Sequence, residues 1–596
     1  MRVLPKIKKP KNINNLQKKF FVFDTETTKL EPNPKNFVFG VVYGWNFKKV
    51  IYTIKDFKLE FSKRKYKGCY MFAHNAEFDL STIYGNIYQN LDSCAIFNGR
   101  FIMAKLPNGL TFADSFNIFP SSVAKIGELI GESKLNNKKV KSAKLRKNNI
   151  TKEDIEYCTI DCKIVYDALT KMFETIGAIK ITISSCAMYS YRSSYLKNDV
   201  YFSELVDEFY NSYYGGRTEA FKIGKVNSYV YDINSLYPYS MVNCVFPDIK
   251  NLKKVSKIDV NYLLFLIKRF EGMAKITVNH KETYFGFLPY KTTKLLFPIG
   301  IFETTVNFNE LRFALKHEII EILNVEYAVF GNPIESPFID FILTNYNLRK
   351  NTNDALDSLI YKLKMNSLYG RFAMRKKFKT EYHNLIPFEI INELQKTEQF
   401  YKLHLFNQER NDCFLTTENE KFKNSFFSIP TYSSYITSHA RITLLENLLK
   451  NEKNRVVYCD TDSIFLEKKF KGNTGKELGQ FKKENKKVVE VNGLKNYKYF
   501  DINFSLDLNR KICKFTKPYK FIIKYTLKGV SKNSIQINEN TFKTVQYYKT
   551  KESLRQSKET GTKKVVIKTL THEYDKRIIL ENGNTKPILL TNITNK

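Results

Sequence analysis

The sequence contains little that would support a disulfide-bonded or zinc-binding protein. Only nine of its 596 residues are cysteine, the number is odd, and no two are spaced as Cys-x-x-Cys. The seven histidines do not cluster with them. A scattered, odd set of thiols is typical of a reducing compartment and argues against a disulfide framework or a zinc site.

Long apolar runs are also missing. No apolar stretch approaches the roughly 20 residues that a helix needs to cross a bilayer, so we expect no membrane partner. The segment from Met1 to Lys11 is basic but lacks the apolar stretch of a secretory signal. We expect a cytoplasmic protein, in the host cytoplasm if the sequence is viral. A mitochondrial location stays open, although the prolines and the lack of serine in this segment argue against a presequence.

Acidic residues are scarce relative to basic ones. The chain has 60 Asp plus Glu against 96 Lys plus Arg, a net charge of +36. Such an excess favours a polyanionic partner, most often nucleic acid. The 48 Phe and 38 Tyr residues offer stacking surfaces for bases, although most of them will be core. Lysine richness also fits the coding bias of an AT-rich genome, which weakens the charge argument.

The segment Val457–Phe465 contains Asp460 and Asp462 inside an apolar run. On a strand or tight hairpin, residues two apart share a face, so both carboxylates point at one spot. They repel each other unless a cation lies between them, and Mg²⁺ is the cation that takes carboxylate oxygens beside phosphates. The β-branched and aromatic flanks are not typical of a solvated acidic turn. The segment therefore predicts a metal site.

A further carboxylate, Asp232, follows a hydrophobic strand and precedes a Ser-Leu-Tyr-Pro step that ends at Pro238. The segments Asp232–Pro238, Lys362–Gly370 and Tyr458–Ser463 resemble three polymerase motifs of family B DNA polymerases and occur in the same order. The resemblance implies a right-hand polymerase with palm, fingers and thumb that acts on primer-template DNA and deoxynucleotides. It also implies two Mg²⁺ ions in each active site, with Mn²⁺ as a possible substitute, and in-line phosphoryl transfer.

The same resemblance assigns roles in the polymerase site. It implies metal ligation by Asp232, Ile233 and Asp462, with Asp460 in a less direct role. Lys362, Asn366 and Tyr369 stand at i, i+4 and i+7 and are expected on one helix face. Tyr237 would exclude a 2′-hydroxyl, Tyr369 would pack on the nascent base pair, and Asn366 and Gly370 would contact DNA. The implied nucleotide-binding residues are Ile233, Tyr237, Lys350, Lys362 and Tyr369, with Arg349 as an alternative to Lys350.

The N-terminal third carries a second set of acids. Asp24 and Glu26 end a predicted strand, Asp79 follows further on, and Tyr157 and Asp161 share a helix face at i, i+4. This set resembles the 3′–5′ proofreading exonuclease motifs of the same family. The resemblance implies metal ligation by the four acids and water orientation by Tyr157. Glu77 and Glu156 lie off the motif positions, and we interpret them as helix-capping or surface charges. The implied single-strand contacts are Asn75, Ser115 and Phe116, and the assisting lysine is left open among Lys134, Lys138 and Lys139.

The segment Tyr213–Arg217 is similar to the YxGG element of the protein-primed branch of the family. The long gaps between Asp232 and Lys362 and between Asn366 and Asp460 have room for the two insertions of that branch. The resemblance implies a terminal protein as primer, in a heterodimer at initiation, and otherwise a monomer. The implied DNA contacts of this region and of the chain's later part are Tyr213, Gly215, Gly216, Arg217, Thr437, Arg441, Lys495, Tyr497 and Lys528.

We therefore expect a multidomain α/β protein. Residues 1–185 would form a ribonuclease H-like exonuclease domain with strands at Phe20–Phe23, Phe37–Tyr43, Val50–Ile54 and Tyr70–Ala73, and a hairpin turn is expected around Pro107–Gly109. The remaining predicted parts are palm at 186–255 and 431–530, insertions at 256–344 and 374–430, fingers at 345–373 and thumb at 531–596.

Two alternatives to a protein-primed polymerase stay open. One is a family B polymerase that is RNA-primed, DNA-primed or primer-independent, although the long gap after Asp232 disfavours the primer-independent type. The other is a catalytically dead nucleic-acid-binding scaffold, against which the intact acids of every motif argue.

Overall fold

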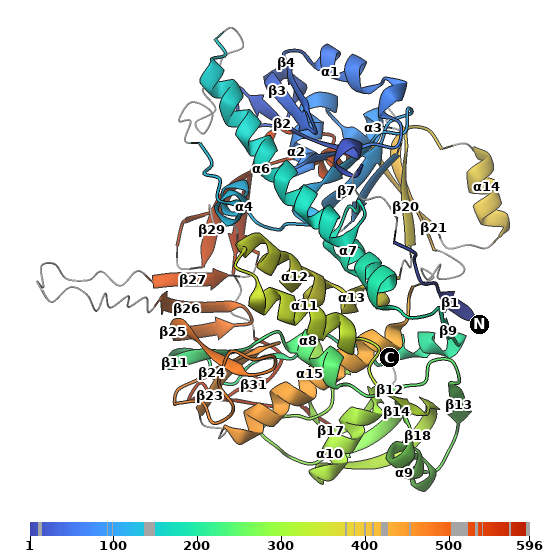
Figure 1. Cartoon of the computed structure of the whole chain (residues 1–596). Coiled ribbons are helices and arrows are strands. Elements are labelled where there is room, and N and C mark those ends of the chain that lie inside the picture. The colour runs from blue at the N-terminus through green and yellow to red at the C-terminus, as the bar shows by residue number, and fades with distance from the viewer. Residues whose placement is uncertain are drawn as a thin grey trace, which may run out of the picture.

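The computed structural model describes residues 1–9, 15–91, 93–97, 99–135, 149–375, 378–386, 388–397, 401–407, 411–418, 427–451, 455–501, 523–527, 529–530, 534–538, 540–570 and 574–591. Its elements form a mixed α/β arrangement in which three large sheets are connected by helices (Figure 1). Among the described residues, no helix combines the length and apolarity required to cross a bilayer. All of the described cysteines are free thiols.

The N-terminal unit is a seven-stranded sheet in the order β4-β3-β2-β5-β8-β7-β6. Helix α6 packs Ile164, Ala168 and Leu169 against one face, where Phe20 and Val22 are buried. Helices α1 and α2 cover the other face. The strands are β2 (Phe20–Thr27), β3 (Phe37–Gly44), β4 (Phe47–Ile51), β5 (Tyr70–Ala73), β6 (Ser93–Phe97), β7 (Arg100–Lys105) and β8 (Thr111–Asp114). The helices are α1 (Ile54–Phe61), α2 (Ala76–Tyr84), α3 (Ile87–Asn90), α4 (Val123–Ile130), α6 (Lys152–Ile176) and α7 (Ile183–Ser190).

Each of the four predicted strands overlaps an observed strand, but boundaries differ: β2 continues to Thr27, and the strand predicted at Val50–Ile54 spans Phe47–Ile51. The strand expected to run to Ile54 ends at Ile51, because Thr53 caps α1 by accepting a hydrogen bond from the backbone N–H of Asp56. The turn predicted near Pro107 connects β7 and β8. Helix α6 begins with a capping box between Thr151 and Asp154 and ends where a glycine adopts positive φ.

The central sheet combines two distant parts of the chain in the order β10-β23-β24-β11-β25-β26-β27. Helices α8 (Leu236–Asn243) and α15 (Pro430–Lys450) supply Leu236, Ala440 and Leu444 to the core beneath it. Its strands are β10 (Thr218–Ala220), β11 (Gly224–Ile233), β23 (Val456–Asp460), β24 (Ser463–Leu466), β25 (Phe481–Gly493), β26 (Asn496–Asp501) and β27 (Ile523–Leu527).

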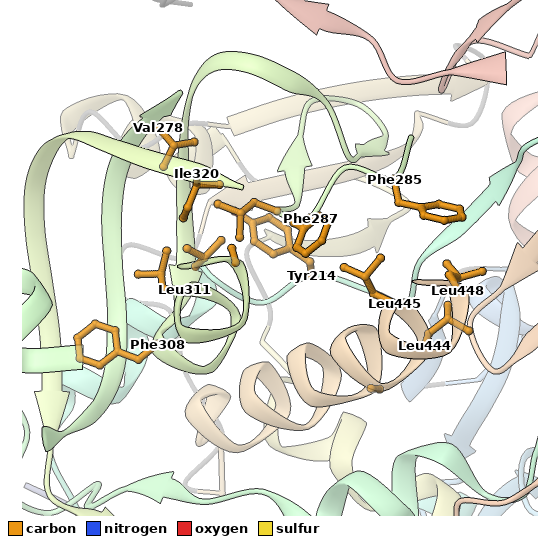
Figure 2. Packing of buried hydrophobic residues seen from close by; sticks show 14 of the residues in the cluster. Tyr214, Val278, Phe285, Phe287, Phe308, Leu311, Ile320, Leu444, Leu445 and Leu448 are labelled. Carbon is orange, nitrogen blue, oxygen red and sulfur yellow. The ribbon is translucent and has the colours of Figure 1, made fainter. Parts of the chain in front are cut away.

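A third sheet, in the order β13-β18-β14-β17-β33, lies beside the central one. Figure 2 shows how the two share a core: Leu444, Leu445 and Leu448 of α15 lie near Tyr214 and Phe285. The elements here are β13 (Lys253–Ser256), α9 (Val260–Arg269), β14 (Glu271–His280), β17 (Ile299–Asn307), α10 (Phe308–Lys316), β18 (Ile320–Gly331) and β33 (Leu589–Leu590). Two separate strand pairs accompany them: β12 (Phe246–Pro247) pairs with β19 (Pro333–Ile334), and β15 (Tyr290–Lys291) pairs with β16 (Leu295–Leu296).

Strand β33 was expected to belong to the thumb, but it extends this third sheet. It pairs in parallel with β17 through Leu589 and Leu590. Upstream, the backbone N–H of Ala220 donates to the Tyr574 hydroxyl, and the Arg577 guanidinium is buried against Glu219. The described C-terminal segment 574–591 therefore packs against the central and third sheets.

Helices α11 (Ile339–Asn351), α12 (Ala355–Ser367) and α13 (Tyr369–Phe372) form the segment predicted as fingers. The predicted single helix from Lys362 to Tyr369 is corrected: α12 ends at Ser367, and Tyr369 begins α13. Helix α12 buries Leu356 and Ile360 in the core of the N-terminal unit.

Two smaller sheets contact the N-terminal unit. The sheet β20 (Phe378–His383), β22 (Asp412–Glu418) and β21 (Tyr401–Asn407), accompanied by α14 (Phe388–Lys396), packs Phe414 against Tyr88 of α3. The sheet β28 (Ile535–Gln536), β29 (Thr541–Tyr547) and β30 (Lys563–Thr569) is accompanied by α16 (Thr550–Arg555). Asn86 donates a hydrogen bond to the Thr550 carbonyl of α16. A further two-stranded pair joins β1 (Arg2–Leu4) to β9 (Val200–Phe202), and another joins β31 (Ile578–Ile579) to β32 (Thr585–Lys586).

Two candidate carboxylate sites

The central sheet brings the three predicted polymerase acids together. Asp232, near the end of β11, and Asp460, at the end of β23, both stand opposite Ser463 of β24 in the strand register. The tight turn between β23 and β24 carries Asp462, whose carbonyl accepts a hydrogen bond from the backbone N–H of Ile233 at 2.7 Å. Residues that lie far apart in the sequence therefore meet at one end of the sheet.

Burial and mutual repulsion act on these carboxyl groups. Burial, followed by the charges of Asp462 and Glu484, raises the pKa of Asp232 to about 7. Burial also raises the pKa of Asp462, and Asp460 adds to the effect. Lys362 of α12 opposes both shifts, so its positive charge lies near both acids. Half-buried carboxylates that repel one another are the donor set that hard divalent cations take, and these residues fit Mg²⁺.

Asp460 is differently placed. Its Oδ1 accepts a hydrogen bond from Thr218 Oγ1 at 3.2 Å, and its Oδ2 lies 3.3 Å from Lys495 Nζ. The ammonium group balances the charge of this carboxylate. The arrangement agrees with the less direct role implied for Asp460.

Gly216 packs tightly against the turn between β23 and β24. A Cβ at this position would lie 2.7 Å from a Thr461 side-chain carbon, and the backbone N–H of Thr461 donates to the Arg217 carbonyl at 2.7 Å. Thr461 itself has a positive φ of 59°. The predicted element Tyr213–Arg217 thus braces the turn that carries Asp460 and Asp462. Gly215 is exposed, and Tyr213 is partly buried near Tyr237.

The predicted nucleotide-binding residues lie on five elements, namely β11, α8, α11, α12 and α13. The rings of Tyr237, from α8, and Tyr369, from α13, stack with centroids 4.3 Å apart and planes 25° apart. The Asn366 amide donates to the Lys362 carbonyl at 2.9 Å, and Gly370 has open space around it. The predicted residue Ile233 has a buried side chain.

Lys350 of α11 forms an ion pair with Glu477, which lies before β25. Its ammonium group lies 2.7 Å from the Glu477 carboxylate, and both groups are exposed. The pair lowers the pKa of Glu477 and raises the pKa of Lys350. The neighbouring Tyr346 hydroxyl donates to the carbonyl of Lys476 at 3.1 Å. Helix α11 is therefore connected to the loop before β25.

Three residues that were predicted to contact DNA have buried side chains, and this corrects the prediction for them. The Arg217 guanidinium binds Glu219 at 2.5 Å, and the Arg441 guanidinium binds Glu310 at 2.8 Å. Thr437 donates to a carbonyl within its own helix. These side chains lie inside the protein, where each has a polar partner from the chain itself.

Lys495 and Tyr497, which the resemblance assigns to the primer end, lie near Asp460. Lys495 has a positive φ of 51° and donates its backbone N–H to the Tyr458 hydroxyl at 3.0 Å. The Tyr497 ring packs edge-on against Phe465. The predicted contact Lys528 lies outside the described residues.

The N-terminal unit holds the second site. Asp24 and Glu26 lie on β2, Asp79 on α2 and Asp161 on α6. The Asp79 carboxylate accepts hydrogen bonds from the backbone N–H and hydroxyl of Thr25 at 3.0 and 2.7 Å. Burial, then the charge of Asp161, raises the pKa of Asp24 to about 7. Burial and neighbouring acids also raise the pKa of Glu26 and of Asp79 well above their usual values. This set, too, fits divalent cations.

Of the lysines that the sequence left open, the structure describes Lys134, which lies beside the acids. Lys134 Nζ lies 2.5 Å from Asp161 Oδ2 and 5.0 Å from the centre of the Tyr157 ring. It is also hydrogen bonded to the Tyr157 hydroxyl. Lys138 and Lys139 lie outside the described residues.

Sequence reasoning overlooked Cys158. Its thiol donates to Asp24 Oδ2 at 3.5 Å, and ligand atoms of Asp24, Glu26 and Cys158 all lie within 4.8 Å of one another. Its position could have identified it as a site residue, because it lies three residues before Asp161 and therefore on the same helix face.

The predicted single-strand contacts are only partly accessible. Asn75 is exposed and has a φ of 73°, and its backbone N–H donates to Asp114 Oδ1 at 2.9 Å. Ser115 is corrected: its hydroxyl is fully buried and donates to the Ala73 carbonyl. Phe116 packs edge-on against His74, a partly buried residue that the sequence did not identify and that hydrogen bonds Ser115.

The interpretation of Glu77 as a cap or surface charge is wrong. Its side chain is 5% exposed, and its carboxylate accepts a hydrogen bond from the backbone N–H of Thr550 at 3.2 Å. The sequence carries no local signal for this contact, since its partner lies far along the chain.

With this geometry in place, comparison with known proteins identifies the class. The model of the family "DNA polymerase type B, organellar and viral" matches residues 130–469, more than half of the chain. The chain belongs to this family, and the predicted resemblance to family B DNA polymerases is confirmed.

Relatives of this chain occur in a phage and in fungi. The chain is 27% identical over 401 residues to the DNA-directed DNA polymerase of Enterobacteria phage PRD1, covering 62% of each. It is 26% identical over 535 residues to a probable DNA polymerase of Podospora anserina and 27% identical over 377 residues to one of Neurospora intermedia. The chain spans 42% and 37% of the lengths of these two fungal proteins.

A solved structure shares the fold. Phi29 DNA polymerase, complexed with primer-template DNA and incoming nucleotide substrates, superposes with a TM-score of 0.65 at 18% identity. The match covers 93% of this chain and 99% of that one. The predicted mixed α/β fold is confirmed.

Proposed function

We propose that the chain is a DNA-directed DNA polymerase with 3′–5′ exonuclease activity, whose substrates are primer-template DNA and deoxynucleotides. The observation that carries this proposal is the meeting of Asp232 and Asp462 with Lys362 and the stacked Tyr237–Tyr369 pair at one end of the central sheet. Family membership and the second acidic site in the N-terminal unit support it.

The proposal gives each part of the fold a role. The N-terminal sheet would be a ribonuclease H-like exonuclease domain, the central sheet with α8 and α15 the palm, and α11 to α13 the fingers. The third sheet would be the first insertion and the β20–β22 sheet the second. The sheet β28–β30 with α16 would be the thumb, whereas the segment 574–591 packs with the palm and first insertion.

In the palm, Asp232 and Asp462 would hold the two Mg²⁺ ions, or Mn²⁺ in their place, with Ile233 contributing its backbone. Bound ions of this kind stabilise the charge that develops on the attacking and leaving oxygens of phosphoryl transfer. Lys362 would bind the triphosphate as a point charge, and Lys350 would do so after leaving Glu477. Tyr237 would close the space beneath the sugar.

In the exonuclease domain, Asp24, Glu26, Asp79 and Asp161 would hold the metal ions. Lys134 lies between Asp161 and Tyr157, so it fixes the tyrosine beside the acids. Tyr157 would then orient the attacking water by a hydrogen bond from its hydroxyl. Asn75 would contact the frayed primer end.

Separating the two activities tests the proposal. Asp462→Ala should abolish nucleotide incorporation and leave primer degradation intact, because the two acid sets lie on different sheets. Asp24→Ala combined with Glu26→Ala should do the reverse. Wild-type thermal stability in each variant is the control. Loss of both activities in one folded variant would contradict two independent sites, and a wild-type chain that binds DNA but has neither activity would support the scaffold alternative.

We further propose that synthesis starts on a terminal protein. Two observations support this: both insertions contain folded sheets, and Gly216 of the Tyr213–Arg217 element braces the catalytic turn. A serine, threonine or tyrosine hydroxyl of the primer protein would take the place of the DNA 3′-hydroxyl in the same site. The polymerase would form a heterodimer with it at initiation and act otherwise as a monomer.

The test requires a candidate terminal protein encoded beside this chain, Mg²⁺ or Mn²⁺, and one labelled nucleotide. A labelled protein adduct that survives denaturation is expected, and Asp462→Ala should prevent it. No adduct, together with efficient extension of RNA-primed templates, would favour the RNA-primed alternative.

A further inference from the structure

Helix α2 contributes an acid to the proposed exonuclease site and also contacts a segment near the end of the chain. Its Asp79 belongs to the exonuclease acids, while Asn75, Glu77 and Phe78 at its start contact the β28–β30 sheet and α16, which we refer to as the thumb. Four residues within one and a half turns of this helix therefore connect the proposed exonuclease site to a segment more than four hundred positions away in the sequence.

Tyr547, at the end of β29, is the thumb residue nearest to this site. Its hydroxyl is close to the Asn75 side chain, and this polar contact lowers the pKa of the hydroxyl. Its ring packs edge-on against Phe78, with centroids 6.0 Å apart. The charges of Glu77, Asp79 and Asp114 all act on the Tyr547 hydroxyl and raise its pKa, after burial. Tyr547 thus lies beside the exonuclease acids although it belongs to another part of the chain.

The thumb is anchored at this position by buried polar contacts. Glu77 accepts the backbone N–H of Thr550, and the Asn86 amide donates to the Thr550 carbonyl at 3.2 Å. Gly561 lies so close to Pro32 that a Cβ would be 2.2 Å from the Pro32 carbonyl oxygen. Lys563 forms an ion pair with Glu31 at 3.0 Å. Buried, satisfied hydrogen bonds hold an interface in one arrangement, so Tyr547 is presented to Asn75 reproducibly.

The backbone and the side chain of Asn75 are fixed by different parts of the molecule. Asp114 accepts the Asn75 backbone N–H and so supports its unusual φ of 73°. This leaves the side-chain torsions, which Tyr547 restrains through its hydroxyl. A binding group that is oriented before the ligand arrives loses less entropy on binding.

We propose that Tyr547 is a positioning residue of the exonuclease site: it orients the Asn75 amide for the 3′-terminal nucleotide of single-stranded DNA, so that this site is shared between the N-terminal unit and the thumb. The proposal rests on the exonuclease function proposed above. It assigns the thumb a part in binding the DNA end and none in the hydrolytic step.

The experiment compares wild type, Tyr547→Phe and the matched control Tyr548→Phe in degradation of a single-stranded oligonucleotide. The neighbouring Tyr548 contacts Lys564 of its own sheet. Tyr547→Phe keeps the ring on Phe78 and removes only the hydroxyl. Its KM should rise about 3- to 10-fold, as expected for one hydrogen bond, with kcat unchanged, and Tyr548→Phe should match wild type.

A double-mutant cycle shows whether Tyr547 acts through Asn75. Asn75→Gly removes the side chain and tolerates the positive φ. Tyr547→Phe should have no further effect in this background. Additive effects, an unchanged KM in Tyr547→Phe, or a loss confined to kcat would each overturn the proposal.

Binding of the DNA end provides a readout without chemistry. An oligonucleotide with 2-aminopurine at its 3′ terminus, titrated with EDTA present, should bind more weakly to Tyr547→Phe by the same factor. If wild-type protein degrades no DNA, the proposed exonuclease fails, and this titration still decides whether Tyr547 contributes to end binding. Equal affinities of wild type and Tyr547→Phe would overturn it.

Discussion

At the residue scale, both sites place carboxyl groups where burial and neighbouring acids oppose their ionisation. Asp24 and Asp232 each have a pKa of about 7, and both belong to sets of acids on different elements. A protein retains such groups when they have a function, because perturbed pKa values concentrate at functional sites. The same repulsion makes stability depend on pH and on divalent cations.

The metal-free protein should lose stability as pH rises from about 4 to about 7. In this window the carboxyl groups ionise in the unfolded chain, with its ordinary Asp pKa of 3.8, before they ionise in the folded one, where the pKa of Asp24 is about 7. The folded state therefore binds more protons, and the free energy of unfolding falls with pH. Asp24→Asn should reduce this fall by roughly 1 kcal/mol or more.

Thermal unfolding with EDTA between pH 5 and pH 8 measures the effect. Asp340→Asn is the control, since that side chain is 67% exposed. Added Mg²⁺ or Mn²⁺ should raise the melting temperature of wild type more at pH 8 than at pH 5. A melting temperature of wild type that rises steadily over this range would contradict the pKa assignments.

Tyr237 allows a test of sugar selection. Its ring is stacked on Tyr369 close to the acids, and Tyr237→Val would open space beneath the sugar. Ribonucleotide use should increase relative to deoxynucleotide use, by an amount on the order of a few kcal/mol of lost discrimination. Competitive incorporation assays measure the ratio, with Tyr239→Val as a neighbouring control. An unchanged ratio would mean that Tyr237 is not the gate.

At the element scale, the N-terminal unit holds three other parts of the chain in place. Helix α12 packs into its core, the β20–β22 sheet contacts α3, and α16 is hydrogen bonded to α2 and α3. The Lys551 ammonium of α16 also lies 5.1 Å from the centre of the Phe414 ring of β22. The N-terminal unit therefore contacts both the β20–β22 sheet and the thumb, and the sheet and the thumb also contact each other.

Deleting residues 385–425 would break this set of contacts at the β20–β22 sheet. The resemblance implies that the second insertion separates the strands ahead of synthesis and encloses the template. If this sheet has that role, products on a primed circular template should become shorter after the deletion, and synthesis should stall at duplex. Filling of a short gap should persist, since the acids of the central sheet are distant from the deletion in the fold. Product lengths on a denaturing gel give the result. Full-length strand displacement by the deletion variant would contradict the assigned role.

At the scale of the whole molecule, the excess of basic residues is the dominant property. The net charge of +36 is spread along the chain, and many lysines are exposed. Some basic groups are engaged in ion pairs such as Lys350–Glu477 and Lys171–Asp354, but these pairs leave the net charge unchanged, because the acids are already counted in it. The excess supplies a positive field for a polyanion.

The affinity for duplex DNA should therefore fall linearly on a plot of log affinity against log salt concentration. The slope reports the counterions released, at about 0.9 for each neutralised phosphate of duplex DNA. Fluorescence anisotropy at several salt concentrations, with EDTA to prevent degradation, measures it. A slope near zero would mean that the basic residues do not line a DNA channel and reflect coding bias.

Sequence reasoning was most successful where chemistry is local. Asp460 and Asp462 are two residues apart, and a strand or tight turn of any protein brings such a pair to one spot. The strands of the N-terminal unit were readable for the same reason, because alternating and continuous apolar runs specify them locally. The order of the motifs was enough to identify the family.

Only the tertiary structure decided which side chains can reach a ligand. Arg217, Thr437, Arg441 and Ser115 resemble contacts in the sequence, but their side chains are buried and bind groups inside the protein, namely Glu219, the Ser434 carbonyl, Glu310 and the Ala73 carbonyl. Long-range packing likewise placed Lys134 beside Asp161 and brought Glu77 and Tyr547 into one interface. The sequence by itself determined the chemistry of each motif, since that depends on residue type and short spacing. The fold determined access and partnership, since these depend on contacts between residues hundreds of positions apart.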